Sequence, residues 1–451
     1  MIKGLNLPIN FKKMNKDEFY TPNISANNSH NNSFSNNESK SNNQSNITNP
    51  RNPSTSNILP PTEELCEDDY LRERLIRVIK EYFRLRNSCP STTLDYYRLI
   101  KMIGKGAFGK VYLGVHLLTG KYVAIKSIEK QYMRDENSKR KVLQEVVILK
   151  KVNHKNVIRL LEVFENKKYL FIVLEYASQG DLLTYVKSRG KLDEKDAKRL
   201  FLQITKGIQY CHHSLILHRD VKLDNILLDE NSNVKVCDFG VSRFIRKGQI
   251  INEQCGTPAY IAPEIIRDKG YEGCYADIWS MGVLLYAMVT GTVPFKATNL
   301  EDLHRGILSG KFSFPEGPGP EVKDLISRMI KLNPYSRISI DDIANHIWFS
   351  DVSVIESETT EEIEPNYKKN ENGISSAAEL LNGRRASKDA LESGNTMQII
   401  ESIVKKVEML GYPREFIIKS INSNSCNHAE ACYYLLYKEY LENPQENIAA
   451  N

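Results

Sequence analysis

The sequence predicts an α+β protein in which a strand-rich lobe is followed by a helical lobe and by a small helical domain. Three observations predict this order. Residues 97–186 read as strands with one helix, residues 194–349 read mainly as helices, and helical periodicity returns over residues 397–440. Hydrophobic residues make up 41 % of the 451 residues. This fraction suits one sizeable core with polar segments attached to it, within a length that allows about two or three domains.

The segments outside the two lobes differ in composition. Asn and Ser dominate residues 23–57, which therefore lack the apolar surface needed to fold, and we expect a disordered tail over residues 1–62. Apolar residues recur at helical spacing over Leu71–Phe83, which predicts an amphipathic helix and connector over residues 63–96. We expect this helix to dock on the following domain, with dimerisation as the alternative. The remaining predicted segments are an acidic and polar linker (350–395), a helical domain (396–443) and a tail (444–451).

Charge and cysteine content exclude several classes of protein. The chain has 61 Lys and Arg against 56 Asp and Glu, a mixed surface with which we expect no nucleic-acid binding. No run reaches the ~20 apolar residues that span a bilayer, so we expect no membrane insertion. The eight cysteines form no CxxC pair, and the start has no apolar core of a secretory signal. We therefore expect reduced thiols in a cytoplasmic protein, with the nucleus as the alternative compartment.

The first motif with chemical meaning is the glycine-rich run Gly104-Lys105-Gly106-Ala107-Phe108-Gly109. The same glycine spacing opens dinucleotide-binding folds, where it leads into a helix. Here strand-like residues lie on both sides, so the pattern predicts a hairpin. Glycine lets a backbone turn and approach phosphates closely, which indicates a nucleotide-binding loop.

Lys126 follows the apolar residues Val123-Ala124-Ile125, where an ammonium group is costly unless it meets an anion. Nucleotide phosphates are one such partner. Glu145, in a segment that reads as a helix, is another. Taken alone, Glu145 is simply a solvated helix residue, but with Lys126 it becomes a candidate for orienting the lysine.

Three further motifs follow in order: His218-Arg219-Asp220-Val221-Lys222-Leu223-Asp224-Asn225, Asp238-Phe239-Gly240 and Ala262-Pro263-Glu264. Their order and spacing match the protein-kinase signature set. Phosphoryl transfer requires in-line positioning and neutralisation of negative charge rather than covalent work by the protein. One lysine, one carboxylate base, two oxygen ligands for cations and a glycine loop supply these needs.

On these motifs, residues 97–349 resemble the eukaryotic protein kinases, which implies the bilobal protein-kinase fold and the use of ATP and Mg²⁺. The resemblance implies that Asp220 accepts the proton of the substrate hydroxyl and that Lys222 contacts the γ-phosphate. Asn225 and Asp238 would hold magnesium.

The same resemblance assigns a nucleotide site. Lys126 would hold the α- and β-phosphates, oriented by Glu145. The implied nucleotide-contacting residues are Ile103, Gly104, Lys105, Gly106, Ala107, Phe108, Gly109, Lys110, Val111, Ala124, Lys126, Glu175, Ala177, Asp181, Leu227 and Cys237.

The resemblance also indicates which group of protein kinases is most similar. Lys222, two residues after Asp220, and Thr257 are typical of serine/threonine kinases, and the motifs resemble the calcium/calmodulin-dependent kinase group. The run Leu410-Gly411-Tyr412, with the helical periodicity on both sides of it, is similar to the ubiquitin-associated-type domain of AMP-activated and microtubule-affinity-regulating kinase relatives. This implies an intramolecular contact between the tail domain and the kinase domain. An ordinary helical bundle without a partner is the alternative.

One position departs from these relatives. They carry an activating phosphothreonine two residues before a loop cysteine, whereas here Glu253 precedes Cys255. Glutamate carries about one negative charge, against ~1.5–2 for a phosphate. Our hypothesis is that Glu253 pairs with Arg219 and primes the activation loop without an upstream kinase. A solvated glutamate without effect is the alternative.

Substrates and partners follow less directly. Asp181 and Asp224 match positions where basophilic kinases place acidic groups, so we expect protein substrates with basic residues before the target site, although Asp181 also suits ribose binding. Arg384-Arg385-Ala386-Ser387 is itself such a site, with chance as the simpler explanation. Regulatory subunits are a further expected class of partner. The alternative function is a scaffold acting through the C-terminal helical domain, with catalysis dispensable.

Overall fold

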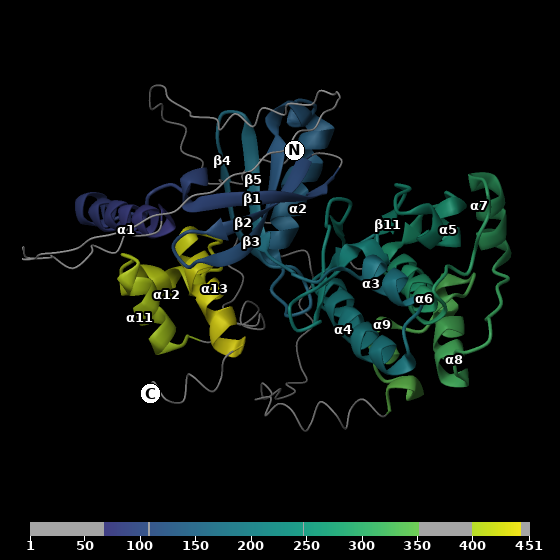
Figure 1. The fold of residues 1–451 in the computed structure, drawn as a ribbon. Coiled ribbons are helices and arrows are strands. Elements are labelled where there is room, and N and C mark those ends of the chain that lie inside the picture. The colour runs from purple at the N-terminus through teal and green to yellow at the C-terminus, as the bar shows by residue number, and fades with distance from the viewer. Residues whose placement is uncertain (1–66, 107–108, 247, 351–398, 443–451) are drawn as a thin grey trace, which may run out of the picture. The chain divides into compact units, whose positions relative to one another are not determined.

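The computed structural model describes residues 67–106, 109–246, 248–350 and 399–442 (Figure 1). The predicted N-terminal tail, the linker with Ser387, the last residues, and Ala107 and Phe108 of the glycine loop lie outside this part of the chain. None of the described helices is long and apolar enough to cross a membrane.

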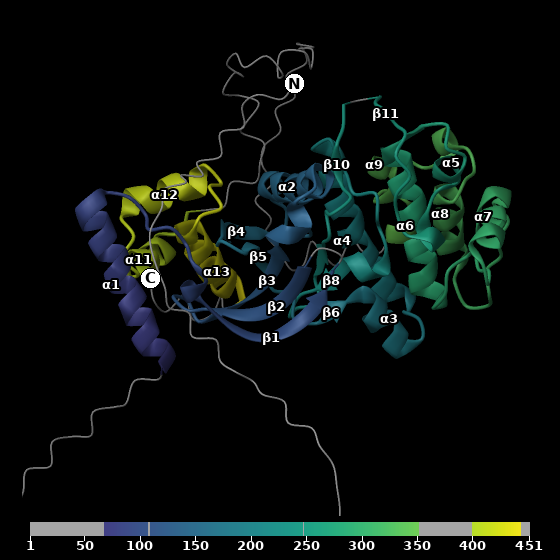
Figure 2. The ribbon, with the colours of Figure 1, turned by 90° about the horizontal axis from the view of Figure 1, so that it is seen from above.

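The strand-rich lobe is one five-stranded antiparallel sheet in the order β1-β2-β3-β5-β4. Helix α2 lies beside this sheet in both views (Figures 1 and 2). Asp135 caps α2 by accepting a hydrogen bond from the backbone N–H of Ser138 at 2.8 Å. Val123 and Ile125 of β3 are fully buried. The bounds are β1 Tyr97–Lys105, β2 Gly109–His116, β3 Lys121–Glu129, β4 Leu160–Glu165, β5 Tyr169–Glu175 and α2 Glu136–Lys151, with short 3₁₀ helices at Leu94–Tyr96 and Lys130–Met133.

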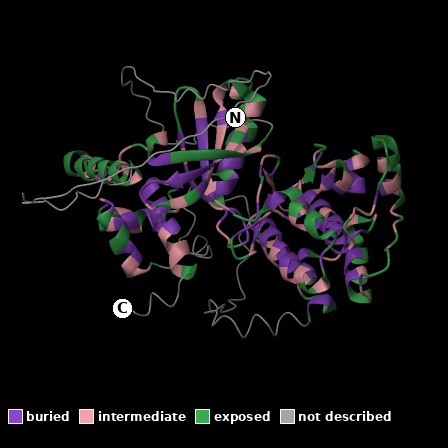
Figure 3. Cartoon of the chain, viewed as in Figure 1, coloured by how far each residue is buried: buried purple, intermediate pink, exposed green. Residues whose placement is uncertain are grey.

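The helical lobe is organised around α6, Gly273–Thr290, which is apolar all round and therefore buried (Figure 3). Its neighbours include α4, Glu194–His213, and α8, Pro320–Met329. The other helices are α3 Leu182–Arg189, α5 Pro263–Ile266, α7 Leu300–Ser309 and α9 Ile340–Ile343, with 3₁₀ helices at Leu223–Asn225, Pro258–Tyr260, Pro334–Ser336 and Ile347–Phe349. The predicted order of a strand-rich lobe before a helical lobe is confirmed.

The helical lobe also contains short strands. They form one three-stranded sheet and two two-stranded ones. Their bounds are β6 Gly180–Asp181, β8 Ile226–Leu228 and β9 Val234–Val236 in the first, β7 Ile216–Leu217 with β10 Arg243–Phe244 in the second, and β11 Ile250–Ile251 with β12 Tyr271–Glu272 in the third.

Three helices form the predicted C-terminal helical unit: α11 Glu401–Met409, α12 Arg414–Asn422 and α13 His428–Glu442. Each contacts the other two. Gly411 joins α11 to α12 with a φ of 101°, a conformation that favours glycine. Residues of this unit share one hydrophobic core with the strand lobe, in which Val123 and Val173 of the sheet lie with Val404 and Tyr433.

Helix α1, Glu67–Arg86, forms where the apolar stripe predicts it. Most of its surface is exposed (Figure 3), but Ile79 is fully buried. Phe83 meets the rings of Phe416 and Tyr412 edge-on at 5.1 and 6.1 Å. Asp68 of α1 also accepts hydrogen bonds from Arg98 of β1 at 2.9 and 2.8 Å, so α1 contacts the following domain as expected. Its aromatic contacts with the C-terminal helices were not expected, because the stripe does not reveal which surfaces cover it.

Candidate active site

Lys126 and Glu145 meet between β3 and α2. The ammonium group of Lys126 lies 2.6 Å from Oε1 of Glu145, and both side chains are largely buried. Lys126 pairs with Val111 of β2 in the sheet register, so the lysine lies beside the strand that follows the glycine loop. A buried, charge-assisted contact of this length holds the ammonium group in one place.

The glycine loop is the turn of the β1–β2 hairpin, as the strand-like flanks predict. Gly104 pairs with Val111 and Lys105 with Lys110, and the N–H of Gly106 donates to the carbonyl of Gly109 at 2.8 Å. A Cβ at Gly109 would clash with the carbonyl oxygen of Ser127, so any larger residue would force the backbone to shift. Ile103 precedes this turn on β1.

Asp220 lies at the centre of a polar cluster. Its carboxylate is 2.8 Å from the ammonium group of Lys222 and accepts hydrogen bonds from the Thr257 hydroxyl at 2.7 Å and the Asn225 amide at 3.0 Å. Burial on its own would raise the pKa of Asp220, but the hydrogen bonds from Lys222 and Thr257 outweigh it, and the pKa is lowered. Asp220 is therefore a charged acceptor.

Asn225 and Asp238 approach each other from adjoining segments. The N–H of Cys237, directly before Asp238, donates to the carbonyl of Asn225 at 2.9 Å. Asp238 has a φ of 65°, and its carboxylate accepts from the N–H of Gly240 at 3.3 Å. An amide oxygen and a carboxylate are hard oxygen ligands of the kind magnesium prefers, so these residues fit that ion.

The connection between the lobes begins at Glu175, the last residue of β5. Ala124 of β3 pairs with Leu174, next to Glu175, and Ala177 is buried. Asp181 caps α3, accepting from the N–H of Thr184 at 2.8 Å. Leu227 lies on β8. Burial raises the pKa of Cys237, so this side chain stays a thiol.

The side chain of Glu175 has partners that the sequence did not reveal. Oε2 lies 2.9 Å from the ammonium group of Lys235 and accepts from the Tyr434 hydroxyl at 2.9 Å. No local motif marks either residue, since Lys235 lies on β9 and Tyr434 on α13.

The loop that carries Glu253 is fixed by two arginines. Arg219 and Arg243 each place a guanidinium nitrogen 3.0 Å from the Glu253 carboxylate. The hydrogen bond from Arg219 is the main reason why the pKa of Glu253 is lowered. The pair with Arg219 was expected from the sequence, whereas Arg243 was missed because it belongs to no motif.

One buried ion pair and one buried carboxylate support this region. Arg337 makes a bidentate contact with Glu264 at 2.6 and 2.7 Å. Asp277 of α6 accepts from the backbone N–H groups of His218 and Arg219 at 3.0 and 2.8 Å. It therefore holds the backbone that leads into Asp220.

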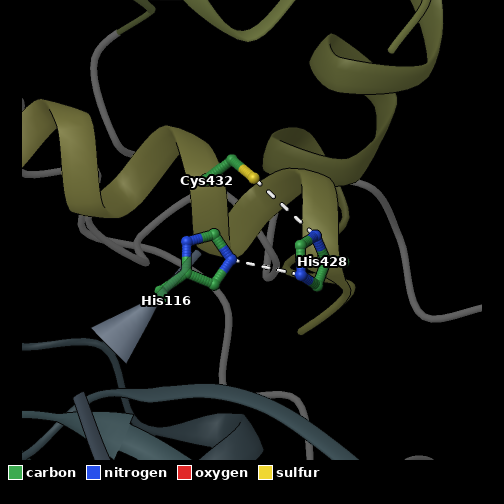
Figure 4. A group of neighbouring side chains, drawn as sticks. All are labelled: His116, His428 and Cys432. Atoms are coloured by element: carbon green, nitrogen blue, oxygen red, sulfur yellow. Dashed lines mark hydrogen bonds between the residues drawn. The ribbon is translucent and has the colours of Figure 1, made fainter. Parts of the chain in front are cut away.

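Within the described ranges, His116, His428 and Cys432 are the one group of three side chains with metal-ligand chemistry at close range (Figure 4). The two Nε2 atoms lie 3.1 Å apart. His116 Nδ1 lies 2.8 Å from the Thr119 hydroxyl, and His428 Nδ1 lies 2.7 Å from the Tyr412 hydroxyl. Cys432 Sγ lies on the Nδ1 side of His428 at 3.7 Å. Because His116 and Cys432 approach opposite nitrogens of one ring, the geometry fits a chain of hydrogen bonds better than a single ion.

Comparison with known proteins agrees with this site. The family model described as "Protein kinase domain" matches residues 97–349. The chain is 35 % identical over 355 residues to the serine/threonine-protein kinase SIK3 homolog of Danio rerio, a match that covers 77 % of this chain. It covers only 27 % of that relative, so the chain spans about a quarter of the relative's length. The motifs, their meeting in one site and the family match lead to one conclusion: the chain belongs to the protein kinase family.

Proposed function

We propose that this chain is a serine/threonine protein kinase of the AMP-activated-kinase-related branch, which transfers the γ-phosphoryl group of ATP to protein substrates. The observation that carries the proposal is the cluster in which Asp220, Lys222 and Thr257 lie within 2.9 Å of one another. Protein kinases in general use ATP and Mg²⁺. The similarity over 355 residues to a relative that is named as a serine/threonine-protein kinase supports the choice of acceptor.

In this mechanism Asp220 orients the substrate hydroxyl and accepts its proton, since its lowered pKa keeps it an acceptor. Lys222 stabilises charge on the transferred group, and Lys126, held by Glu145, positions the nucleotide phosphates. Asn225 and Asp238 would hold magnesium, which when bound neutralises phosphate charge. The glycine loop and Asp181 complete the nucleotide site, together with the hinge between the lobes, residues 175–177, whose backbone would hold adenine.

The test is the transfer of labelled γ-phosphate to a library of Ser- and Thr-containing peptides by the full-length chain. Asp220→Asn should reduce kcat at least ~100-fold, because general-base catalysis contributes 10²–10⁴. Asp302→Asn, on exposed α7, is the matched control and should keep full activity. If Asp220→Asn abolished transfer but kept every phenotype in cells, the chain would act as a scaffold instead.

We also propose that Glu253 takes the place of an activating phosphate. It is bound by Arg219, the residue directly before Asp220, and by Arg243, so its charge reaches the catalytic loop. Residues 238–264 contain one Ser and one Thr. Ser242 is buried, with its hydroxyl bonded to the carbonyl of His218, and Thr257 contacts Asp220. Neither hydroxyl lies where a phosphate would reach Arg219 without leaving these contacts.

Protein expressed in bacteria, without an upstream kinase, tests this proposal. Wild type should be active, and Glu253→Ala should lose about tenfold in activity with the loss of two charge-assisted hydrogen bonds. Glu301→Ala on exposed α7 is the control. Equal activity of wild type and Glu253→Ala would reject the priming role.

Substrate preference is proposed to be basic, through Asp181 and Asp224. Asp224 is exposed beside Asn225, whereas Asp181 is already engaged in capping α3, which leaves Asp224 the freer carboxylate. Asp224→Asn should therefore reduce any enrichment of Arg and Lys before the target residue in the peptide library. A wild-type library without such enrichment would refute the preference.

We further propose the domain division 1–62, 63–96, 97–349, 350–395, 396–443 and 444–451, with residues 396–443 as a ubiquitin-associated-like domain that regulates the kinase domain. Regulatory subunits and a cytoplasmic or nuclear location complete the proposal. Fluorescent tagging of the full-length chain and mass spectrometry of the proteins that co-purify with it would test both.

A further inference from the structure

We propose that Tyr434 of α13 is a positioning residue for the nucleotide site, because its hydroxyl fixes the hinge residue Glu175 and so couples the packing of the C-terminal helices to nucleotide binding. This inference rests on the proposed kinase function, which assigns the backbone around Glu175 and Ala177 to adenine. Tyr434 touches no nucleotide itself and acts through Glu175.

The Glu175 carboxylate is buried and is held by donors from three separate elements. Oε1 accepts from the backbone N–H of Arg159 at 2.7 Å, in the segment before β4. Oε2 contacts Lys235 of β9 and the hydroxyl of Tyr434, each at 2.9 Å. Glu175 is only 2 % exposed, so water cannot replace a donor that is removed. Its position therefore depends on all three.

Tyr434 is itself held in place. The guanidinium group of Arg159 lies 4.6 Å above its ring and also contacts Glu430, one turn earlier on α13, at 2.9 Å. Burial raises the pKa of Tyr434 well above its usual range, so the phenol remains a donor. The two carboxylates, Glu175 and Glu430, balance the charges of Arg159 and Lys235, which makes the buried cluster neutral only when α13 is packed.

Two ion pairs nearer the surface join α13 to the strand lobe and to the helical lobe. Lys121, at the start of β3, lies 2.5 Å from Glu439, and Lys438 lies 2.8 Å from Glu230, between β8 and β9. These four side chains are partly exposed, so the two ion pairs contribute little free energy to the packing of α13 and mainly fix its position. The buried contact at Glu175 is the one that reaches the nucleotide site.

Coupling of this kind works in both directions. A hinge that α13 already holds in one position has less freedom to lose when adenine binds, so nucleotide binding is favoured. Bound nucleotide in turn favours packed α13. We therefore expect removal of the Tyr434 hydroxyl to weaken nucleotide binding by about fivefold, at the lower end of known coupling between sites.

The experiment compares full-length wild type, Tyr434→Phe and the matched control Tyr437→Phe, whose ring stacks on Tyr433 on the same helix. The dissociation constant of a fluorescent ATP analogue with Mg²⁺ should rise about fivefold in Tyr434→Phe only, and KM for ATP should rise while kcat changes less. Hydrogen exchange gives a second readout: nucleotide should protect α13 in wild type and in the control, but not in Tyr434→Phe.

Equal affinities in wild type and Tyr434→Phe, with α13 protected in both, would overturn the inference and leave the proposed kinase function standing. A wild type that binds no nucleotide would overturn both. If Tyr434→Phe does not fold, Glu175→Gln serves instead. It keeps the backbone that faces adenine but weakens the contacts to Lys235 and Tyr434, and it should raise the dissociation constant in the same way.

Discussion

The ion pair between Glu264 and Arg337 illustrates how a single residue governs stability. The Arg337 side chain is fully buried, and it also donates to the backbone carbonyls of Lys331 and Tyr275. Arg337→Leu leaves a buried carboxylate without a partner and should lower the free energy of unfolding by about 3–5 kcal/mol. Chemical denaturation of the full-length chain measures this change.

The control for this prediction is Arg305→Leu, since Arg305 pairs with Glu301 on exposed α7. That change should stay within about 0.5 kcal/mol of wild type. An equal loss of stability in both variants would contradict the account of Arg337 as a buried partner.

Prediction from sequence succeeded for residues that belong to spaced motifs. Lys126 and Glu145 were expected together and lie 2.6 Å apart, and Arg219 was expected to reach Glu253. Arg243 and Tyr434 were not foreseen, because a contact made by tertiary packing leaves no local pattern. Partners of this kind can be read only from the fold itself.

At the scale of elements, Gly411 allows α1 to lie against the turn between α11 and α12. A Cβ added there would approach Lys80 Cγ at 2.9 Å and the carbonyl oxygen of Ile76 at 3.3 Å. Gly411→Ala should therefore displace α1 as well as strain the turn. The expected result is faster hydrogen exchange over residues 67–86.

Gly120→Ala controls for the backbone cost alone. Gly120 also has a positive φ, 69°, but a Cβ there would meet nothing within 4 Å. Gly120→Ala should lower the free energy of unfolding by about 1 kcal/mol and leave hydrogen exchange in α1 unchanged. Helical periodicity was sufficient to place α1, but the C-terminal helices that pack on Phe83 lie at the other end of the sequence and could not be read from the stripe.

At the scale of the whole molecule, the packing of the C-terminal helices on the strand lobe should depend on pH. His116 and His428 face each other with room for one proton between the two Nε2 atoms. Burial lowers the pKa of His116 to about 3 and that of His428 well below its usual value. Separated helices would expose both imidazoles, with pKa values of ~6.5. Packing is therefore fully favoured above that pH and weakens as the pH falls below it.

The buried Glu162 acts in the opposite direction. Burial raises its pKa to about 7, so below this pH the packed form takes up one proton that the separated form does not. The net difference is about one proton, or ~1.4 kcal/mol for each pH unit between ~4.5 and 6.5. The other groups facing the pair, Tyr96, Tyr97, Tyr412 and Cys432, have raised pKa values and stay protonated.

Hydrogen exchange of α13 at pH 7.5 and 5.5, corrected for the intrinsic rate, measures this dependence. His304→Gln on α7 should leave the loss of protection unchanged, and His116→Gln should reduce it. Exchange in α13 that is the same at both pH values would contradict the prediction. The overall order of lobes was predictable from the sequence, whereas this interface was not, because it depends on the tautomers of two residues 312 positions apart.

The carboxylate of Glu253, bound by Arg219 and Arg243, has one consequence for control of the enzyme in the cell. A phosphate ester can be hydrolysed, so kinases switched on by phosphorylation are switched off by phosphatases. A side-chain carboxylate offers no such bond. With Glu253 in the proposed role, this kinase has no modification at that position that a phosphatase could remove. Its activity would then be limited by its abundance, its substrates and the helices packed behind its hinge.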